Sequence, residues 1–218
     1  MGVMLMRILL AAIFAMSGAQ AQAHEIWIEK DSSGPARIYL GEPDYPTPEG
    51  GDKEFHRLRA PQVFQTNAKE VIPVVRRSDH LEANISGKGD IRLRDDDIFA
   101  PEMGEDGKYA ARIYYAKAGR AEIAPKLDFE VVPLEPGGST FQILFQGKPT
   151  PKEGVRIIRP DGWLKNIKSD QNAQFTVPTD ISGRYLLFVD HNEAVNRQLD
   201  DKAVSKITHV TTLTFVQP

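Results

Sequence analysis

Histidines are the residues of this chain best suited to chemistry, and His24 is the most suggestive of them. It follows the small residues of Ala21-Gln22-Ala23 and precedes Glu25-Ile26-Trp27. If a signal peptidase cuts after Ala23, His24 becomes the first residue and offers its α-amine as well as its imidazole. These two kinds of nitrogen titrate near ~8 and ~6.5, so both can be neutral donors close to neutral pH. Together they close a chelate ring on copper, nickel or cobalt. The alternative is that a histidine follows the cleavage site by chance.

The first 23 residues have the succession of a secretory signal. Arg7 is followed by the apolar run Ile8 to Met16 and then by the small residues of 17–23. The run is shorter than the roughly 20 residues that a membrane-spanning helix needs. Cleavage after Ala21 or after Ala23 fits the pattern, but only the second frees the amine of His24. We therefore expect residues 1–23 to be a signal peptide and the rest to be a soluble periplasmic protein.

A second group of candidate ligands lies near the end of the chain. His191 and Glu193 follow the apolar run 184–189 at a spacing that places both on one face of an extended strand. His209 lies early in the last apolar run, 207–216. If the two runs form an antiparallel hairpin, His191 and His209 are near neighbours at one rim. The alternative interpretations are a solvated loop entrance for His191 and a packed core position for His209.

The first half of the chain offers two further candidates. His80 follows Asp79, whose carboxylate could orient the imidazole as an acceptor. Glu42 lies just past the predicted second strand and approaches His24 if the first two strands pair. His56 is expected at the surface. The run 95–97 (Asp-Asp-Asp) lacks the spaced ligands and glycine of a calcium loop and is interpreted as a solvated turn.

Composition excludes several classes of protein. The 218 residues are 41% hydrophobic and 26% charged, as in ordinary folded proteins, and the net charge is −3 with no basic run, which argues against nucleic acid as a partner. There are no cysteines, so a metal site must use imidazole, carboxylate, carbonyl or amine ligands. The sequence has no Gly-x-Ser-x-Gly elbow, phosphate loop, His-Glu-x-x-His or dinucleotide fingerprint. We therefore expect a binding protein rather than an enzyme.

The elements that must position these residues are short strands. Apolar or alternating segments are broken by Gly, Pro, Asp and Asn about every ten residues, which predicts an all-β fold of two β-sandwich domains. The expected strands of the first domain are 26–29, 36–40, 62–66, 71–76, 81–85, 91–94, 108–116 and 127–132; those of the second are 140–145, 155–159, 163–169, 174–177, 184–189 and 207–216.

The predicted boundary between the domains is the segment 133–138, Pro-Leu-Glu-Pro-Gly-Gly. It separates an N-terminal β domain, 24–133, from a C-terminal sandwich, 138–218. One connection breaks the regular spacing, because residues 192–206 separate the last two strands by more than a usual hairpin does. We expect this segment to be a functional or mobile loop with a histidine at each end.

Several motifs give the chain a family resemblance. They are Ala-His-Glu-Ile-Trp-Ile-Glu (23–29), Ile-Tyr-Leu-Gly-Glu (38–42), Arg-Arg-Ser-Asp-His (76–80), Phe-Gln-Gly-Lys-Pro (145–149), Pro-Asp-Gly-Trp (160–163), Gly-Arg-Tyr-Leu-Leu (183–187), Asp-His (190–191) and Val-Thr-Thr-Leu-Thr-Phe (210–215). On these the chain resembles the exported DUF4198 family, whose members are similar to periplasmic components linked to nickel and cobalt uptake. The resemblance implies an immunoglobulin-like or transthyretin-like second domain. It also implies metal handling by His24, with His80 and His191.

The leading hypothesis is a periplasmic metal-binding protein that captures nickel, cobalt or copper for uptake or delivery to a membrane transporter. Its candidate ligands are His24, His80, His191, His209, Glu193 and Glu42. One alternative is a copper-dependent polysaccharide oxidase, in which an N-terminal histidine and a second one form a brace around copper. The other is a metal-free adhesion or assembly module.

Overall fold

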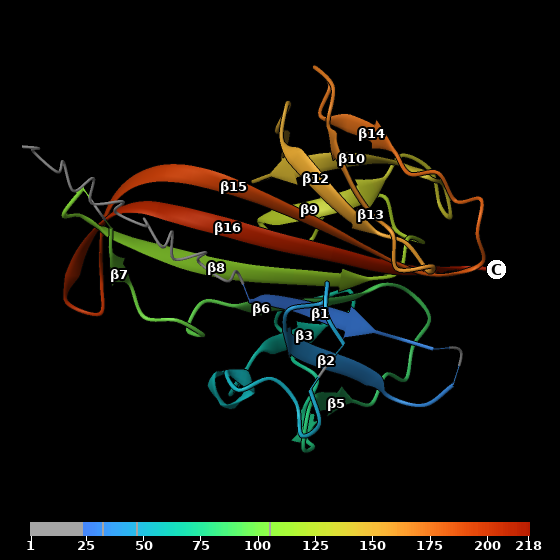
Figure 1. Cartoon of the computed structure of the whole chain (residues 1–218), viewed down its shortest axis with the longest axis horizontal. Helices are drawn as coiled ribbons and strands as arrows, with labels where there is room; N and C mark the ends of the chain where they lie inside the picture. The colour runs from blue at the N-terminus through green and yellow to red at the C-terminus, as the bar shows by residue number, and fades with distance from the viewer. Residues whose placement is uncertain (1–23, 32, 47, 105) are drawn as a thin grey trace, which may run out of the picture.

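The strands predicted from the sequence form an all-β protein (Figure 1). This computed structural model describes residues 24–218 except 32, 47 and 105, so the predicted signal peptide, 1–23, lies outside the described residues. The elements are β1 (Glu25–Glu29), β2 (Ala36–Gly41), the 3₁₀ turn η1 (Phe55–Arg57), β3 (Gln62–Phe64), β4 (Val74–Arg76), β5 (Leu81–Ala83), β6 (Ile91–Asp95), β7 (Glu102–Met103), β8 (Tyr109–Ala118), β9 (Phe129–Pro133), β10 (Thr140–Phe145), β11 (Lys148–Pro149), β12 (Gly154–Ile158), β13 (Leu164–Lys168), β14 (Gln174–Thr176), β15 (Gly183–Leu199) and β16 (Lys202–Gln217). Within this part of the chain no helix is long and apolar enough to cross a membrane.

A large central sheet lies between two smaller ones. Its strand order is β13-β12-β15-β16-β8-β6-β3, with β7 on the edge of β8. One outer layer is the sheet β1-β2-β5-β4, and the other contains β9, β10, β11 and β14. In Figure 1 the long central strands β8, β15 and β16 run horizontally, with β9, β10 and β14 above them and β1, β2 and β5 below.

The central sheet combines both halves of the sequence. β8 and β16 pair in parallel from Val204↔Tyr109 to Thr214↔Ala118, whereas the other described strand pairs are antiparallel. The predicted domain boundary, 133–138, begins at the last residue of β9 and otherwise lies in the connection from β9 to its hairpin partner β10. The two halves thus share one sheet, and their independence as domains stays a prediction.

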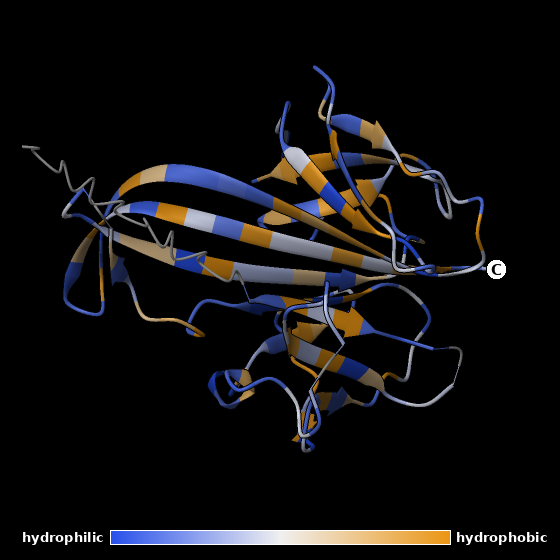
Figure 2. Ribbon diagram, in the orientation of Figure 1, coloured by the Kyte–Doolittle hydropathy of each residue, from blue (hydrophilic) through white to orange (hydrophobic). Residues whose placement is uncertain are grey.

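The expected loop at 192–206 is a strand hairpin instead, so that prediction is wrong. β15 and β16 continue past the predicted ends, and Leu199 pairs with Lys202 around a two-residue turn. Asp200 and Asp201 both have positive φ, 49° and 60°, the conformation of a type I′ turn. Asn, Arg and Gln occupy much of β15 beyond His191, and Figure 2 shows this end of the strand coloured mainly as hydrophilic. The polar residues concealed the strand, although Val195 and Leu199 pack against the core that contains Val204.

Strand alternation divides the interior into two cores on opposite faces of the central sheet. Along β8, Ile113 and Tyr115 point into the core against β9, β10 and β14. Tyr114 and Ala116 point into the core against β1, β2 and β5. Figure 2 shows hydrophobic residues along the strands of both outer layers, and buried members of these strands belong to the two cores. Both faces of β8 are therefore buried.

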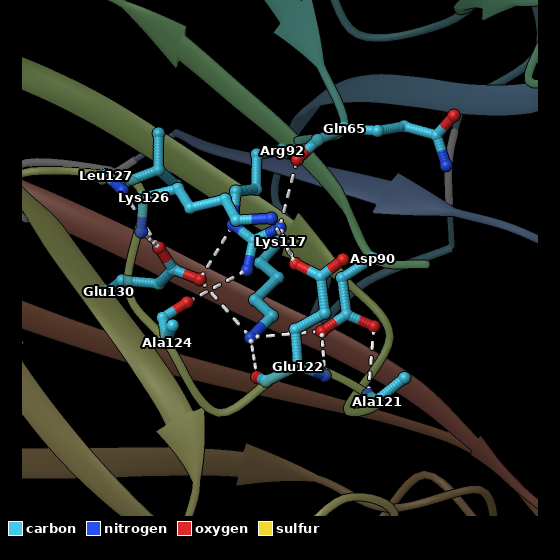
Figure 3. Close-up of polar contacts among 10 residues, drawn as sticks. All are labelled: Gln65, Asp90, Arg92, Lys117, Ala121, Glu122, Ala124, Lys126, Leu127 and Glu130. Carbon is cyan, nitrogen blue, oxygen red and sulfur yellow. Dashed lines mark hydrogen bonds and ion pairs between the residues drawn. The ribbon is translucent and has the colours of Figure 1, made fainter. Parts of the chain in front are cut away.

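A network of buried charges replaces apolar packing near the end of β8 (Figure 3). The side chains of Arg92 and Glu130 are 0% exposed, and Arg92 Nε donates to Glu130 Oε1 at 2.9 Å. Lys117 Nζ lies 3.2 Å from both Asp90 Oδ2 and Glu130 Oε1 and donates to the carbonyl oxygen of Glu122 at 3.1 Å. Each ion thus has partners that compensate for its removal from water. The network joins β6 and β8 to β9 and orders the segment between β8 and β9.

Candidate metal centre

His24 lies immediately before β1, where the sheet β1-β2-β5-β4 meets the central sheet. The hydroxyls of Thr212 and Thr214 on β16 donate to the carbonyl oxygens of Ile26 and Ile28, the first at 2.7 Å. These bonds fasten the edge of β1 to a face of the central sheet. The β1 backbone that carries His24 is therefore held firmly.

The imidazole of His24 faces a carboxylate. Its Nε2 lies 3.1 Å from Oδ1 of Asp52, and the His24 side chain is 9% exposed. The ring of Phe99 lies beside the imidazole, with centroids 6.1 Å apart. Asp52 is itself positioned by the backbone, because its Oδ1 accepts a hydrogen bond from the Glu54 amide at 2.7 Å. Sequence reasoning missed Asp52, which lies in a loop without a recognisable motif.

Glu42 lines the same hollow as His24 and Asp52. The hollow has a volume of about 350 Å³. Because Glu25 pairs with Gly41 across β1 and β2, the next residues, His24 and Glu42, lie side by side. Gly51, also in the lining, has φ +90°, and a Cβ there would stand 2.7 Å from the Cα of Asp79. Glycine thus lets the loop that carries Asp52 pack tightly against Asp79.

His80, next to Asp79 in the chain, has its own carboxylates. Its Nδ1 is 2.8 Å from Asp79 Oδ1, the contact expected from the sequence, and its Nε2 is 3.5 Å from Glu82 Oε1. The hydrogen bond from His80 lowers the pKa of Asp79. The ring also packs on Tyr39, with centroids 5.4 Å apart. Both imidazole nitrogens therefore face acceptors that lie outside the His24 hollow.

His191 and His209 are directly opposite each other on β15 and β16, as the hairpin hypothesis predicted. Each has a separate carboxylate: His191 Nδ1 is 2.7 Å from Glu153 Oε1, and His209 Nε2 is 3.1 Å from Glu193 Oε2. The predicted Glu193 is thus a neighbour of His209.

Aromatic rings surround this histidine pair. Phe145 contacts both imidazoles, with centroid distances of 4.8 Å to His191 and 4.7 Å to His209. The Tyr115 hydroxyl is 3.1 Å from His209 Nδ1, so both nitrogens of His209 have partners. Burial lowers the pKa of His209, against the opposing hydrogen bond from Glu193. The arrangement is that of a packed, neutral imidazole rather than of an open ligand.

The remaining sequence candidates lie elsewhere. His56 is exposed, and its Nδ1 lies 2.8 Å from the carbonyl oxygen of Lys53. In the run 95–97, Asp96 and Asp97 are exposed, but Asp95 is buried, and burial raises its pKa to about 6. Oδ1 of Asp95 accepts the amide of Asp97 at 2.9 Å, so this segment is a turn in which one of the three carboxylates is not solvated.

The six predicted ligands therefore do not converge. They occupy three places: His24 with Glu42, His80, and His191 with His209 and Glu193. Among residues 24–31, 33–46, 48–104 and 106–218, no group of three or more His, Asp or Glu side chains is arranged to hold a metal ion. At His24, however, imidazole and carboxylate oxygens lie together, and a free amine there would add a third kind of donor. This donor chemistry fits copper, nickel or cobalt.

Comparison with known proteins does not assign a function to this site. No family model, no curated protein and no solved structure matches the chain. The resemblance to the DUF4198 family and the immunoglobulin-like or transthyretin-like detail of the second half therefore stay predictions.

Proposed function

We propose that the processed protein, beginning at His24, is a periplasmic binding protein for nickel, cobalt or copper. The α-amine and imidazole of His24 would hold the metal, with Asp52 as a carboxylate ligand and Glu42 beside it. The observation that supports this proposal is the 3.1 Å contact between His24 Nε2 and Asp52 Oδ1 in a hollow that Glu42 also lines. Nitrogen donors combined with carboxylate oxygens suit these ions.

The predicted export suggests a role in metal transport. A periplasmic binding protein of this kind would deliver its ion to a membrane transporter. His80, His191, His209 and Glu193 have no part in the proposed centre, because each faces partners in another region. The copper-oxidase alternative needs a second imidazole on the same metal. The described contacts of the His24 ring are with Asp52 and Phe99, so no observation favours that alternative.

Isothermal titration of nickel, cobalt and copper salts into protein that begins at His24 tests the proposal. We expect saturable binding at neutral pH. His24→Ala should abolish the chelate and weaken binding at least ~100-fold, and Asp52→Asn should weaken it ~10-fold. His56→Ala is the matched control, because it removes an exposed imidazole outside the hollow. Absence of binding by the processed protein, or equal binding by His24→Ala, would contradict the proposal.

A further inference from the structure

The hairpin end of β15 has a backbone edge that no described strand covers. β12 pairs with β15 only from Leu186 to Val189. Across residues 190–199, the edge that faces away from β16 makes no backbone hydrogen bond to any described residue. Figure 1 shows this end of β15 extending past β9, β10 and β12. The backbone of residues 190–199 on this side is called the open edge below.

The open edge lacks features that protect other edge strands of the protein. An unpaired strand edge tends to pair with another strand, and proteins prevent this with short edges, lysine or proline. The edge strands β3 and β4 are three residues long, and the edge strand β13 carries Lys165 and Lys168. The open edge is longer than a typical whole strand of ~5–6 residues, and it contains neither lysine nor proline. It is therefore suited to pair with a further strand.

The side chains along the open edge indicate which strand fits. By strand alternation Glu193, Val195 and Arg197 share one face, and Val195 packs against the core on that face. Glu193 and Arg197 lie at equal distances along the strand on either side of Val195. If two copies pair antiparallel with their Val195 residues opposite each other, each Glu193 faces an Arg197 of the other copy. Centring the pairing on Glu193 or on Arg197 would instead bring like charges together.

Both charges are available for such a contact. The Glu193 side chain is 24% exposed, although its Oε2 is 3.1 Å from His209 Nε2. Arg197 is exposed and forms no ion pair with a described residue. Opposite charges directly across two antiparallel strands stabilise the pair, and like charges destabilise it. The open edge is thus complementary to a second copy of itself.

The position of the hairpin also permits this pairing. In an antiparallel arrangement the body of each copy lies beyond the hairpin tip of the other, so the two bodies point away from each other (Figure 1). The register between β15 and β16 shifts between Ala194 and Arg197, and such a bulge bends a strand. A two-fold axis at Val195 passes through this bend in both copies, so the two edges bend together.

We propose that the protein forms a two-fold symmetric dimer in which the open edges of two copies pair antiparallel about Val195. The two central sheets then form one continuous sheet. Because a single pair of strands buries a small surface, the dimer dissociates on dilution. The dimer requires neither a metal nor the free amine of His24.

Disulfide formation tests the register of this pairing. The chain has no cysteine, so one substitution reports one contact. In Val195→Cys the two thiols are directly opposite, where Cα atoms ~4.5–5.5 Å apart suit a disulfide. Gln198→Cys is the matched control, because its two copies lie at opposite ends of the paired edges. Mild oxidation should cross-link Val195→Cys at least ~10-fold faster than Gln198→Cys. Equal rates, or no cross-link in Val195→Cys, would overturn the proposal.

Charge reversal tests whether the two edges are complementary. Sedimentation velocity of metal-free protein beginning at His24 should show a dimer at ~100 μM that dissociates near ~1 μM. Arg197→Glu and Glu193→Arg should each be monomeric at ~100 μM, and their equimolar mixture should recover the dimer, because every glutamate then faces an arginine. Lys165→Glu is the matched control on the edge strand β13 and should dimerise like the wild type.

Circular dichroism monitors whether each variant is folded. If Glu193→Arg does not fold, Arg197→Glu and the cross-linking pair provide the test, because Arg197 has no ion pair that the substitution would break. A wild type that stays monomeric at ~100 μM, a dimer of Arg197→Glu as stable as that of the wild type, or a mixture of folded variants that stays monomeric would each contradict the proposal. Omitting metal keeps these results separate from the outcome of the metal proposal.

Discussion

The protonation of the Glu25 carboxyl depends on its burial in the fold. Its carboxyl is 6% exposed beside β15 and β12, with Arg156 as the nearest cation. The pKa rises from 4.5 to about 8, chiefly because burial disfavours the ionised form. The folded protein therefore retains a proton at Glu25 that the unfolded chain releases above pH ~4.5.

This difference predicts that stability falls with rising pH. Between pH ~4.5 and ~8 the folded state binds more protons at Glu25, so this group's stabilisation is complete below that range and is lost as pH rises to 8. Each pKa unit corresponds to about 1.4 kcal/mol. Urea unfolding from pH 5 to 8.5 should show a decline in wild type that is reduced in Glu25→Gln, which cannot ionise. Parallel profiles for the two proteins would refute the expectation.

At the residue scale, the sequence predicted which side chains are neighbours better than it predicted how they combine into a site. The pairing of His80 with Asp79 and of His191 with His209 followed from adjacency and strand register. Asp52 could not be found, because it reaches His24 through a loop whose course depends on packing against Asp79. Glu25 lay outside the predicted strand 26–29 and was not expected to be buried, since its burial arises from β12 and β15, far along the sequence.

At the scale of elements, the central sheet buries an arginine and a lysine at positions where strand alternation alone would predict solvent-exposed side chains. Arg92 on β6 and Lys117 on β8 lie on the face that packs against β9, where their charges meet Glu130. The sequence identified these strands but gave no reason to place their charges inside. The partners lie on another strand and in the segment 119–128, so only the tertiary structure reveals the network.

The network predicts a large effect for one substitution. Lys117→Met keeps much of the side-chain length but leaves Asp90 and Glu130 without the ammonium that lies 3.2 Å from each. Removing one partner of a buried ion pair costs ~3–5 kcal/mol, which denaturant unfolding at pH 7 would measure. Lys108→Met, at an exposed position, should change stability by less than ~0.5 kcal/mol. A loss below ~1 kcal/mol in Lys117→Met would show that the network is not important for stability.

At the scale of the whole molecule, the all-β class and most strand positions were predictable from alternation and turn residues. The arrangement of the strands was not. A parallel pair of strands separated by more than 80 residues, β8 and β16, leaves no local pattern in the sequence. The prediction of two domains used the Pro- and Gly-rich segment at 133–138, which the structure places between two strands of one hairpin.

The shared sheet predicts that the protein unfolds as one unit. β8 contributes Tyr115 to one core and Tyr114 to the other, and both tyrosines are 1% exposed. Loss of either outer layer would therefore expose one face of the central sheet and weaken the pairing of β8 with β16. Calorimetry of residues 24–218 should show one transition, with equal calorimetric and van't Hoff enthalpies. Two separate transitions, or a folded fragment 24–133 with dispersed amide resonances, would instead favour two independent domains.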